Sequence, residues 1–387
     1  MKRKRQFLVA GGIRMSGGWS QQLLDGLGDT LTKEGEGELR VVNTDEVLEL
    51  VQKPPVDIQC CGVVGFFYEK DRVWLEEVVS RRIPVVCMSA ERPPAGVHWV
   101  HNDDETCGRW AAEHFLDQGL PNFAVLGMQS AFSRKRAEGF LQTIAEAAET
   151  RDDISPQVRV FDKCFKEPES ELVAWLKSLP TPTGLYACND FLGSLALRLC
   201  LRESRWVPEE VSIVGTDDDD FLCHAGGIPM SSVQPNWRKI GGRAAVILRV
   251  AGAEKEALEQ RIHPVGLKMR QSSDFFAFVD ADVVRALRFI RSTDLATLKV
   301  ADIVEASKLS QRTLERRFQE SVRHSIHDEI HRERLRRALE LINGTDSDLD
   351  EIAQVCGFGP TEAFSKAFSE RFGFSPADAR REWQVTS

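Results

Sequence analysis

A change of pattern near residue 275 constrains the fold of this chain more than any other feature. Before it, short apolar runs such as residues 62–67, 123–126 and 184–188 alternate with segments of helical periodicity. Strand–helix alternation of this kind predicts open parallel α/β sheets. After residue 280 no strand-like run remains, and short helical segments separated by polar breaks predict a compact all-helical domain.

Length then sets the number of domains. The chain has 387 residues, and an α/β region of about 270 residues is longer than one sheet usually needs. We therefore predict a two-lobed α/β domain over residues 1–275, a linker over 276–284, and an all-α domain over 285–387.

Composition and charge exclude several classes of protein. With 42% hydrophobic and 28% charged residues, the chain is neither disordered nor fibrous. No apolar run approaches the roughly 18 residues that span a bilayer, so we expect no membrane partner. Residues 7–13 follow a basic stretch, but they are too few for a signal peptide and are interpreted as a first buried strand. Nine cysteines without a C-x-x-C spacing indicate reduced thiols and a cytoplasmic protein.

Residues 300–322 have the pattern of a helix-turn-helix motif. A short helix over 300–306 and a tight turn precede Ser310, which can cap the next helix. Leu314 and Phe318 face inward in that helix. The opposite face carries polar side chains that suit base edges, namely Gln311, Arg312, Glu315 and Arg316. Arginine can bind guanine bidentately, and glutamate can accept from cytosine.

The same pattern recurs about 50 residues later. A helix over 349–355 and a turn at Gly357 lead into a second helix with Thr361, Glu362 and Lys366 facing outward. An arginine-rich helix over 327–342 connects the two units. The net charge of -9 excludes a uniformly basic coat, but residues 308–337 carry nine basic side chains against five acidic ones. One such unit alone is often a plain helical hairpin, whereas two on a basic connector predict entry into successive major-groove turns, about 34 Å apart.

The all-α domain resembles the AraC family of bacterial transcription regulators. The residues that carry this resemblance are 350–358, 363–368 and 372–376, ending at Arg380. The resemblance implies base-reading roles for Arg312, Glu315 and Arg316 in the first unit and for Thr361, Glu362 and Lys366 in the second. It implies double-stranded DNA and RNA polymerase as partners. The family usually has glycine where Lys308 and Arg323 stand, so these two turns depart from its pattern.

Motifs of enzymes and cofactor sites are missing from the sequence. It contains no P-loop, G-x-S-x-G or H-E-x-x-H, so we predict no catalytic residue and no cofactor. His327 and His331 lie one helical turn apart, with His324 nearby, but we interpret them as polar surface rather than metal ligands.

Polar side chains follow the predicted strands of the α/β domain, where open parallel sheets bind ligands. Carboxylates, an amide, an arginine and an aromatic ring together suit a sugar. The candidate ligand-binding residues are Asp217, Arg136, Asn189, Asp190, Asp103 and Trp19. We interpret residues 218–220 as a solvated acidic loop, and Trp99 as a packing residue.

The α/β domain also resembles a known family, the sugar-sensing domain of LacI-type repressors and periplasmic binding proteins. The residues that carry the resemblance are 136–140, 189–190, 214–217 and 231–235. It implies that the chain crosses between lobes near 102–103, near 233–234 and near 265. Together the two resemblances imply a sugar-responsive transcription regulator and favour xylose as the sugar. We expect a symmetric homodimer, because this is the commonest oligomer.

Two alternatives stay open at this point. One is a sugar-binding module or carbohydrate enzyme whose helical tail only binds proteins. The other is a DNA-binding regulator that senses a nucleobase or a sugar phosphate, although the carboxylates of the predicted site would repel a phosphate.

Overall fold

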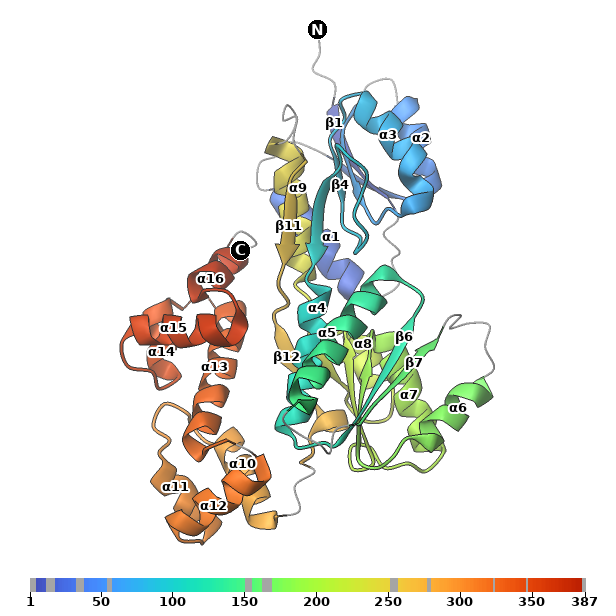
Figure 1. Cartoon of the computed structure of the whole chain (residues 1–387). Helices are drawn as coiled ribbons and strands as arrows, with labels where there is room; N and C mark the ends of the chain where they lie inside the picture. Colours follow the sequence, from blue (N-terminus) through green and yellow to red (C-terminus); the bar gives the residue numbers. More distant parts are fainter. Residues whose placement is uncertain are drawn as a thin grey trace.

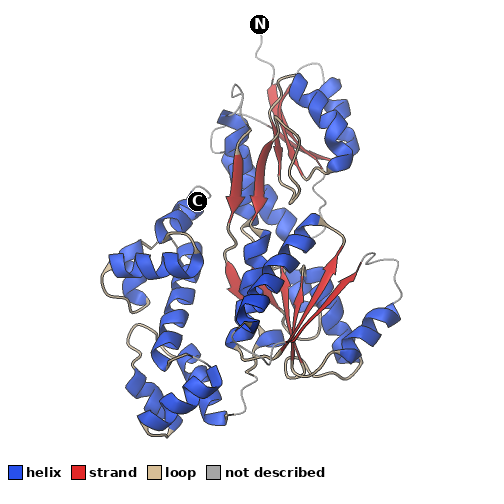
Figure 2. Cartoon of the chain, in the orientation of Figure 1, coloured by secondary structure: helices blue, strands red, loops and turns tan. Residues whose placement is uncertain are grey.

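A computed structural model describes most of the chain, as two α/β lobes followed by a helical domain (Figures 1 and 2). The described residues are 5–11, 18–32, 38–53, 58–149, 155–161, 169–250, 257–276, 280–322, 324–345 and 347–384. No helix in these ranges is long and apolar enough to cross a membrane.

Lobe 1 is a six-stranded parallel sheet. Its strand order is β2 (Glu38–Val42), β1 (Arg5–Gly11), β3 (Ile58–Gly65), β4 (Val85–Cys87), β5 (His98–Asn102) and β11 (Glu259–Ile262). Successive side chains of a strand point to opposite faces, and here both faces are covered. Val64 and Val86 pack under α1 (Gly18–Thr32) and α9 (Trp237–Val250). Val63 and Val85 pack under α2 (Thr44–Gln52) and α3 (Arg72–Ser80).

Lobe 2 repeats this arrangement. Its order is β7 (Ser155–Phe161), β6 (Asn122–Met128), β8 (Thr183–Ala187), β9 (Val211–Thr216), β10 (Ser231–Gln234) and an antiparallel β12 (Gly266–Lys268). One face is covered by α4 (Asp104–Asp117) and α5 (Ala131–Ala148). The other is covered by α6 (Glu169–Ser178), α7 (Asp190–Arg202) and the short α8 (Asp220–His224).

The chain passes between the lobes three times, as predicted. The first crossover joins β5 to α4 at residues 102–104, the second joins β10 to α9 at 234–237, and the third joins β11 to β12 at 262–266. A short 3-10 helix, η2 (Gln271–Ser273), follows β12 and is anchored in lobe 2, because Ser272 donates to the carbonyl of Ile213 at 2.6 Å.

The helical domain has two helix pairs at the two ends of one long helix (Figure 1). After α10 (Ala281–Ser292), the first pair is α11 (Val300–Ser307) and α12 (Gln311–Val322). The long helix α13 (Ile326–Gly344) leads to the second pair, α14 (Leu349–Val355) and α15 (Thr361–Phe372), and α16 (Pro376–Gln384) follows. Leu314 and Phe318 are buried in the first pair, and Phe364 and Phe368 in the second, as their helical spacing predicted.

Candidate functional site

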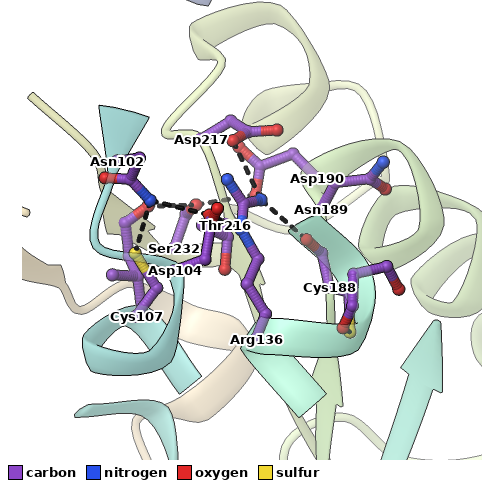
Figure 3. A network of polar contacts seen from close by, with 12 residues as sticks. Asn102, Asp104, Cys107, Arg136, Cys188, Asn189, Asp190, Thr216, Asp217 and Ser232 are labelled. Carbon is purple, nitrogen blue, oxygen red and sulfur yellow. Dashed lines mark hydrogen bonds and ion pairs between the residues drawn. The ribbon is translucent and has the colours of Figure 1, made fainter. Parts of the chain in front are cut away.

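The centre of the candidate ligand site is Arg136, on α5 (Figure 3). Its side chain is 2% exposed. Nε donates to Oδ1 of Asp104 at 2.8 Å, and Nη1 donates to the carbonyl of Cys188 at 2.7 Å and to Oδ1 of Asp217 at 3.1 Å. The guanidinium thus ties together the loops that follow β5, β8 and β9. Burial would lower the pKa of Arg136, but the carboxylates of Asp217 and Asp104 outweigh it and raise that pKa.

Close packing of α4 against α5 places Asp104 beside Arg136. A Cβ atom at Gly108 would overlap the carbonyl oxygen of Arg136, and one at Gly139 would overlap that of Glu105. Only glycine allows two helix backbones to approach this closely. The pair Arg136–Asp104 is therefore fixed by backbone contact rather than by two flexible side chains.

Asp190, at the start of α7, lies beside Asp217 (Figure 3). Its carboxylate accepts from the hydroxyl of Ser232 at 2.6 Å and from the backbone N–H of Asp219 at 2.8 Å. Burial, together with the charge of Asp217, raises the pKa of Asp190. A carboxyl group that is easily protonated can donate as well as accept, which is what hydroxyl groups require of a partner.

The loop after β9 is held in a strained conformation. Asp217 has φ of +119° and Asp218 has φ of +47°, in the region that L-residues rarely adopt. Burial also raises the pKa of Asp217, although Arg136 opposes that shift. Backbone strain of this kind costs on the order of 1–3 kcal/mol per residue and clusters at functional sites.

The other predicted ligand residues lie around this centre with different partners. Asn189 caps α7 by accepting from the N–H of Leu192 at 2.9 Å. Asp103 caps α4 through Thr106 and lies 2.9 Å from Nδ1 of His263. Trp19, on lobe 1, packs in an aromatic cluster with Phe66 and Trp237, at centroid distances of 5.5 and 5.3 Å. The structure brings Asp217, Arg136 and Asp190 together, and it joins neither Asp103 nor Trp19 to them by a contact.

The interpretation of residues 218–220 as a solvated acidic loop is wrong for two of the three. Asp218 accepts from Arg270 and from Gln234, and Asp219 is 2% exposed. Asp219 Oδ2 accepts from the backbone N–H of Gly18 at 2.7 Å, which joins lobe 2 to lobe 1. Only Asp220 is solvated, with a side chain that is 91% exposed. Trp99 is a packing residue, as predicted, and its indole donates to the carbonyl of Ser89 at 2.8 Å.

Sequence reasoning missed four residues of this network: Asp104, Asp219, Ser232 and Arg270. Asp104 is one residue from the predicted Asp103, and the sequence holds no signal that decides which of two adjacent aspartates turns inward. Ser232 and Arg270 lie on or beside strands that the apolar pattern did not reveal.

The polar residues predicted on the two outer helices lie at the surface. Gln311, Arg312, Glu315 and Arg316 are all exposed on α12. Glu362 and Lys366 are exposed on α15, and Thr361 is half-buried with its hydroxyl on Asp350. Lys308 has φ of +62°, so the turn keeps the left-handed backbone that glycine would give. Arg323 lies outside the described residues.

Several arginines of α13 are occupied by contacts within the protein, which reduces the basic surface that the sequence indicated. Arg332 pairs with Asp117 of lobe 2, and Arg336 pairs with Glu333 at 2.8 Å. Arg334 donates to the carbonyls of Leu295 and Leu298. Within the described ranges, no group of three His, Cys, Asp or Glu side chains could hold a metal ion.

Comparisons with known proteins agree with this architecture. A family model for a periplasmic binding protein-like domain matches residues 112–273, and one for a helix-turn-helix domain matches residues 303–382. The xylose operon regulatory protein of Escherichia coli strain K12 is 26% identical over 374 residues, which are 94% of each chain. The protein of the same name from Haemophilus influenzae is 28% identical over 329 residues, 82% of this chain and 84% of that one. These relatives are transcription regulators and not enzymes.

A solved structure shows the same fold over nearly the whole chain. It is the structure of the xylose-binding transcription activator xylR, which has a TM-score of 0.58 and 24% sequence identity and covers 98% of this chain and 99% of its own.

Proposed function

Because the chain joins a periplasmic binding protein-like domain to an AraC-type helix-turn-helix domain and is homologous to the xylose operon regulatory proteins, we propose that it is a cytoplasmic transcription regulator whose binding to double-stranded DNA responds to a sugar. The buried network of Arg136, Asp190 and Asp217 at the ends of the lobe 2 strands is the observation that carries the sugar-binding part of the proposal.

The chemistry of lobe 2 favours a small neutral polyol. Asp190 and Asp217 offer paired oxygens, Arg136 offers a fixed donor, and Asn189 adds an amide at the same edge of the sheet. The aromatic cluster around Trp19 on lobe 1 suits the apolar face of a sugar ring. Among sugars we favour xylose, because both xylose operon regulatory proteins align over most of the chain.

The spacing of the two outer helices supports DNA binding. The connecting helix α13 has 19 residues and is therefore about 28 Å long, close to the roughly 34 Å between successive major grooves on one face of a duplex. Gln311, Arg312, Glu315 and Arg316 on α12 contact one groove in this proposal, and Thr361, Glu362 and Lys366 on α15 contact the next.

Sugar would act by stabilising the closed arrangement of the lobes. The contact between Asp219 and the N–H of Gly18 already spans the two lobes, and Asp219 in turn donates to Asp190 of the site. A ligand that contacts both lobes shifts the population toward closure. We further propose that the regulator acts as a homodimer, since symmetric dimers are the commonest oligomers. The resemblance of the helical domain to the AraC family supports RNA polymerase as a further partner.

Titration calorimetry on the full chain tests the ligand, with D-xylose, L-arabinose, D-ribose, cellobiose, adenine and ribose 5-phosphate as probes. We expect xylose to bind, Asp217→Asn to weaken that binding at least tenfold, and the matched control Asp220→Asn to leave it unchanged. Binding of adenine or the phosphate alone would overturn the sugar assignment. A DNA fragment from the gene's own upstream region, titrated in a gel shift with and without the sugar, tests the regulatory part.

A further inference from the structure

The helical domain rests against lobe 2 along a surface formed by α4, β12 and the third crossover (Figure 1). The ring of Trp110 on α4 meets that of Phe372, with centroids 6.1 Å apart. Nη2 of Arg371 lies 2.9 Å from Oε2 of Glu113, also on α4. Both residues of the helical domain are the last two of α15, so the second helix-turn-helix unit is the one that α4 holds.

His263 is the residue at which this surface reaches the crossovers. It lies in the third crossover, and its Nδ1 is 2.9 Å from Oδ2 of Asp103 in the first crossover. The two atoms are close, but they are not aligned as a hydrogen bond. The imidazole ring stacks on the ring of Phe374, with centroids 4.6 Å apart and planes 19° from parallel. One side chain therefore touches two crossovers and the loop that follows α15.

The first helix-turn-helix unit has a different environment. Its α12 packs on α10, α11 and α13, and Arg317 pairs with Asp280 and Asp282 at the start of the helical domain. These contacts bind the unit to its own domain.

The surface between the helical domain and lobe 2 is not continuously packed. A cavity of about 110 Å³ lies in it, with walls that include Glu113, Asp117, Arg332 and Arg336. An interface that keeps paired charges around a cavity can rearrange without exposing a large apolar area, unlike a close-packed core.

We propose that His263 is the positioning residue through which a rotation of the two lobes moves the DNA-binding domain. A rotation changes the backbone of the crossovers more than that of the sheets, because the sheets move as rigid bodies. His263 contacts both a crossover residue and Phe374, so the loop after α15 follows the crossover. Because α13 is one continuous helix, α12 at its far end is carried along.

This inference rests on the proposed function. Its test uses two readouts, so that a failure of the inference can be told from a failure of the proposed function. The first is the ratio of DNA dissociation constants without and with D-xylose, measured on the full chain. The second is amide hydrogen exchange of the sugar-free, DNA-free protein, which needs no ligand.

The variants remove the stack from either side. His263→Ala removes both contacts of the imidazole, His263→Phe keeps the stack on Phe374, and Phe374→Ala removes the stack without touching the sensor. His331→Ala is the matched control, because His331 also meets a phenylalanine ring, Phe358 at 5.3 Å, but both belong to the helical domain.

We expect exchange to rise in α4 and residues 371–374 in His263→Ala and Phe374→Ala, with α11 and α12 unchanged. We also expect their xylose ratio to fall toward one from a wild-type value in the usual range of roughly 5–150. DNA affinity without sugar should stay within about threefold, a change smaller than one lost base contact causes. His263→Phe keeps the ring stack and should recover most of the xylose ratio. If His263 only stabilised the fold, this recovery would not be expected.

Two results would overturn the inference. One is unchanged hydrogen exchange in both His263→Ala and Phe374→Ala. The other is a loss of the xylose response in His331→Ala that is as large as in His263→Ala. If the wild type shows no dependence on any sugar, the proposed function fails, and the exchange experiment still decides whether His263 anchors the helical domain.

Discussion

The two helix-turn-helix units are built from equivalent helices and differ in what surrounds them. In the first unit, the polar residues of α12 pair with one another along the helix, Gln311 with Glu315 and Arg316 with Glu320, at 2.8–2.9 Å. In the second unit, the end of α15 is docked on lobe 2. The comparison indicates that α12 packs within the helical domain, whereas α15 is anchored to lobe 2.

The hydrophobic cores of the two units also differ in whether they reach the α/β domain. The first unit buries Leu314 and Phe318 within its own domain. In the second, Phe364, Phe368 and Phe372 form a row of rings, 5.6 and 4.6 Å apart, which continues to Trp110 of the sensor. Damage to the second core should therefore be felt in the sensor, whereas damage to the first should stay local.

Phenylalanine truncation tests this with the largest expected effect. Phe318→Ala and Phe368→Ala should each lower the free energy of unfolding by about 3–5 kcal/mol, since both rings are fully buried. Urea unfolding measures the loss. Hydrogen exchange should rise only in α10–α12 and the start of α13 for Phe318→Ala, whereas for Phe368→Ala it should rise in the second unit and also in α4. An equal rise of hydrogen exchange in α4 in both variants would contradict the comparison.

The turns of the two units offer a second test. Gly357 has φ of +76°, and a Cβ atom there would lie 2.7 Å from the carbonyl oxygen of Leu295. Gly357→Ala should therefore cost about 2 kcal/mol of stability, from strain and the clash together. Thermal unfolding measures it, with Gly359→Ala as the control, since a Cβ at Gly359 meets nothing within 4 Å. Equal losses in the two variants would refute the role given to this turn.

DNA affinity gives the next largest effect. Arg312→Ala and Lys366→Ala should each weaken binding on the order of tenfold, if each unit reads its own groove. Arg198→Ala, which removes the same charge from an exposed position of the sensor, should change affinity little. Fluorescence anisotropy at two salt concentrations measures all three. A loss in only one of the two reading-helix variants would show that one unit alone contacts DNA.

The smallest effect is expected at Lys308, which occupies a left-handed position that glycine adopts freely. Lys308→Gly relieves strain but adds freedom to the unfolded chain, so we expect a net gain of ~0.5 kcal/mol. The sign is opposite to that of Gly357→Ala, and the thermal midpoint reports it. A lower midpoint would mean that the lysine side chain contributes contacts that outweigh the strain.

The sequence predicted the buried strands and the long helices well because they follow simple periodicities. Residues 123–126 and 184–188 fall within or beside β6 and β8, and the helix predicted over 327–342 lies within α13. The strands β2, β7, β10, β11 and β12 were missed, because they lie at or near sheet edges and mix polar with apolar residues. The helices α2, α8 and α16 were missed as well.

Side-chain partners in the site were harder to predict than its location. Placement of Arg136, Asp190 and Asp217 at strand ends follows from the topology of a parallel sheet. The partner Asp104 depends on which way a loop turns. The partner Arg270 belongs to a polar segment after β12 that is anchored in lobe 2. Such cases are decided by tertiary contacts, which the local sequence pattern does not reveal.

The three crossovers also have a consequence for how the nascent chain folds during synthesis. Lobe 1 is assembled from residues 5–102 and 237–262, so the face of its sheet that α9 covers stays open until residue 250 has left the ribosome. Most of lobe 2 is translated in between, as an insertion with its own core. We expect lobe 2 to fold first. Until α9 has been synthesised, Leu23 and Leu27 of α1 lack the helix that they pack against, and they form an apolar surface to which chaperones can bind.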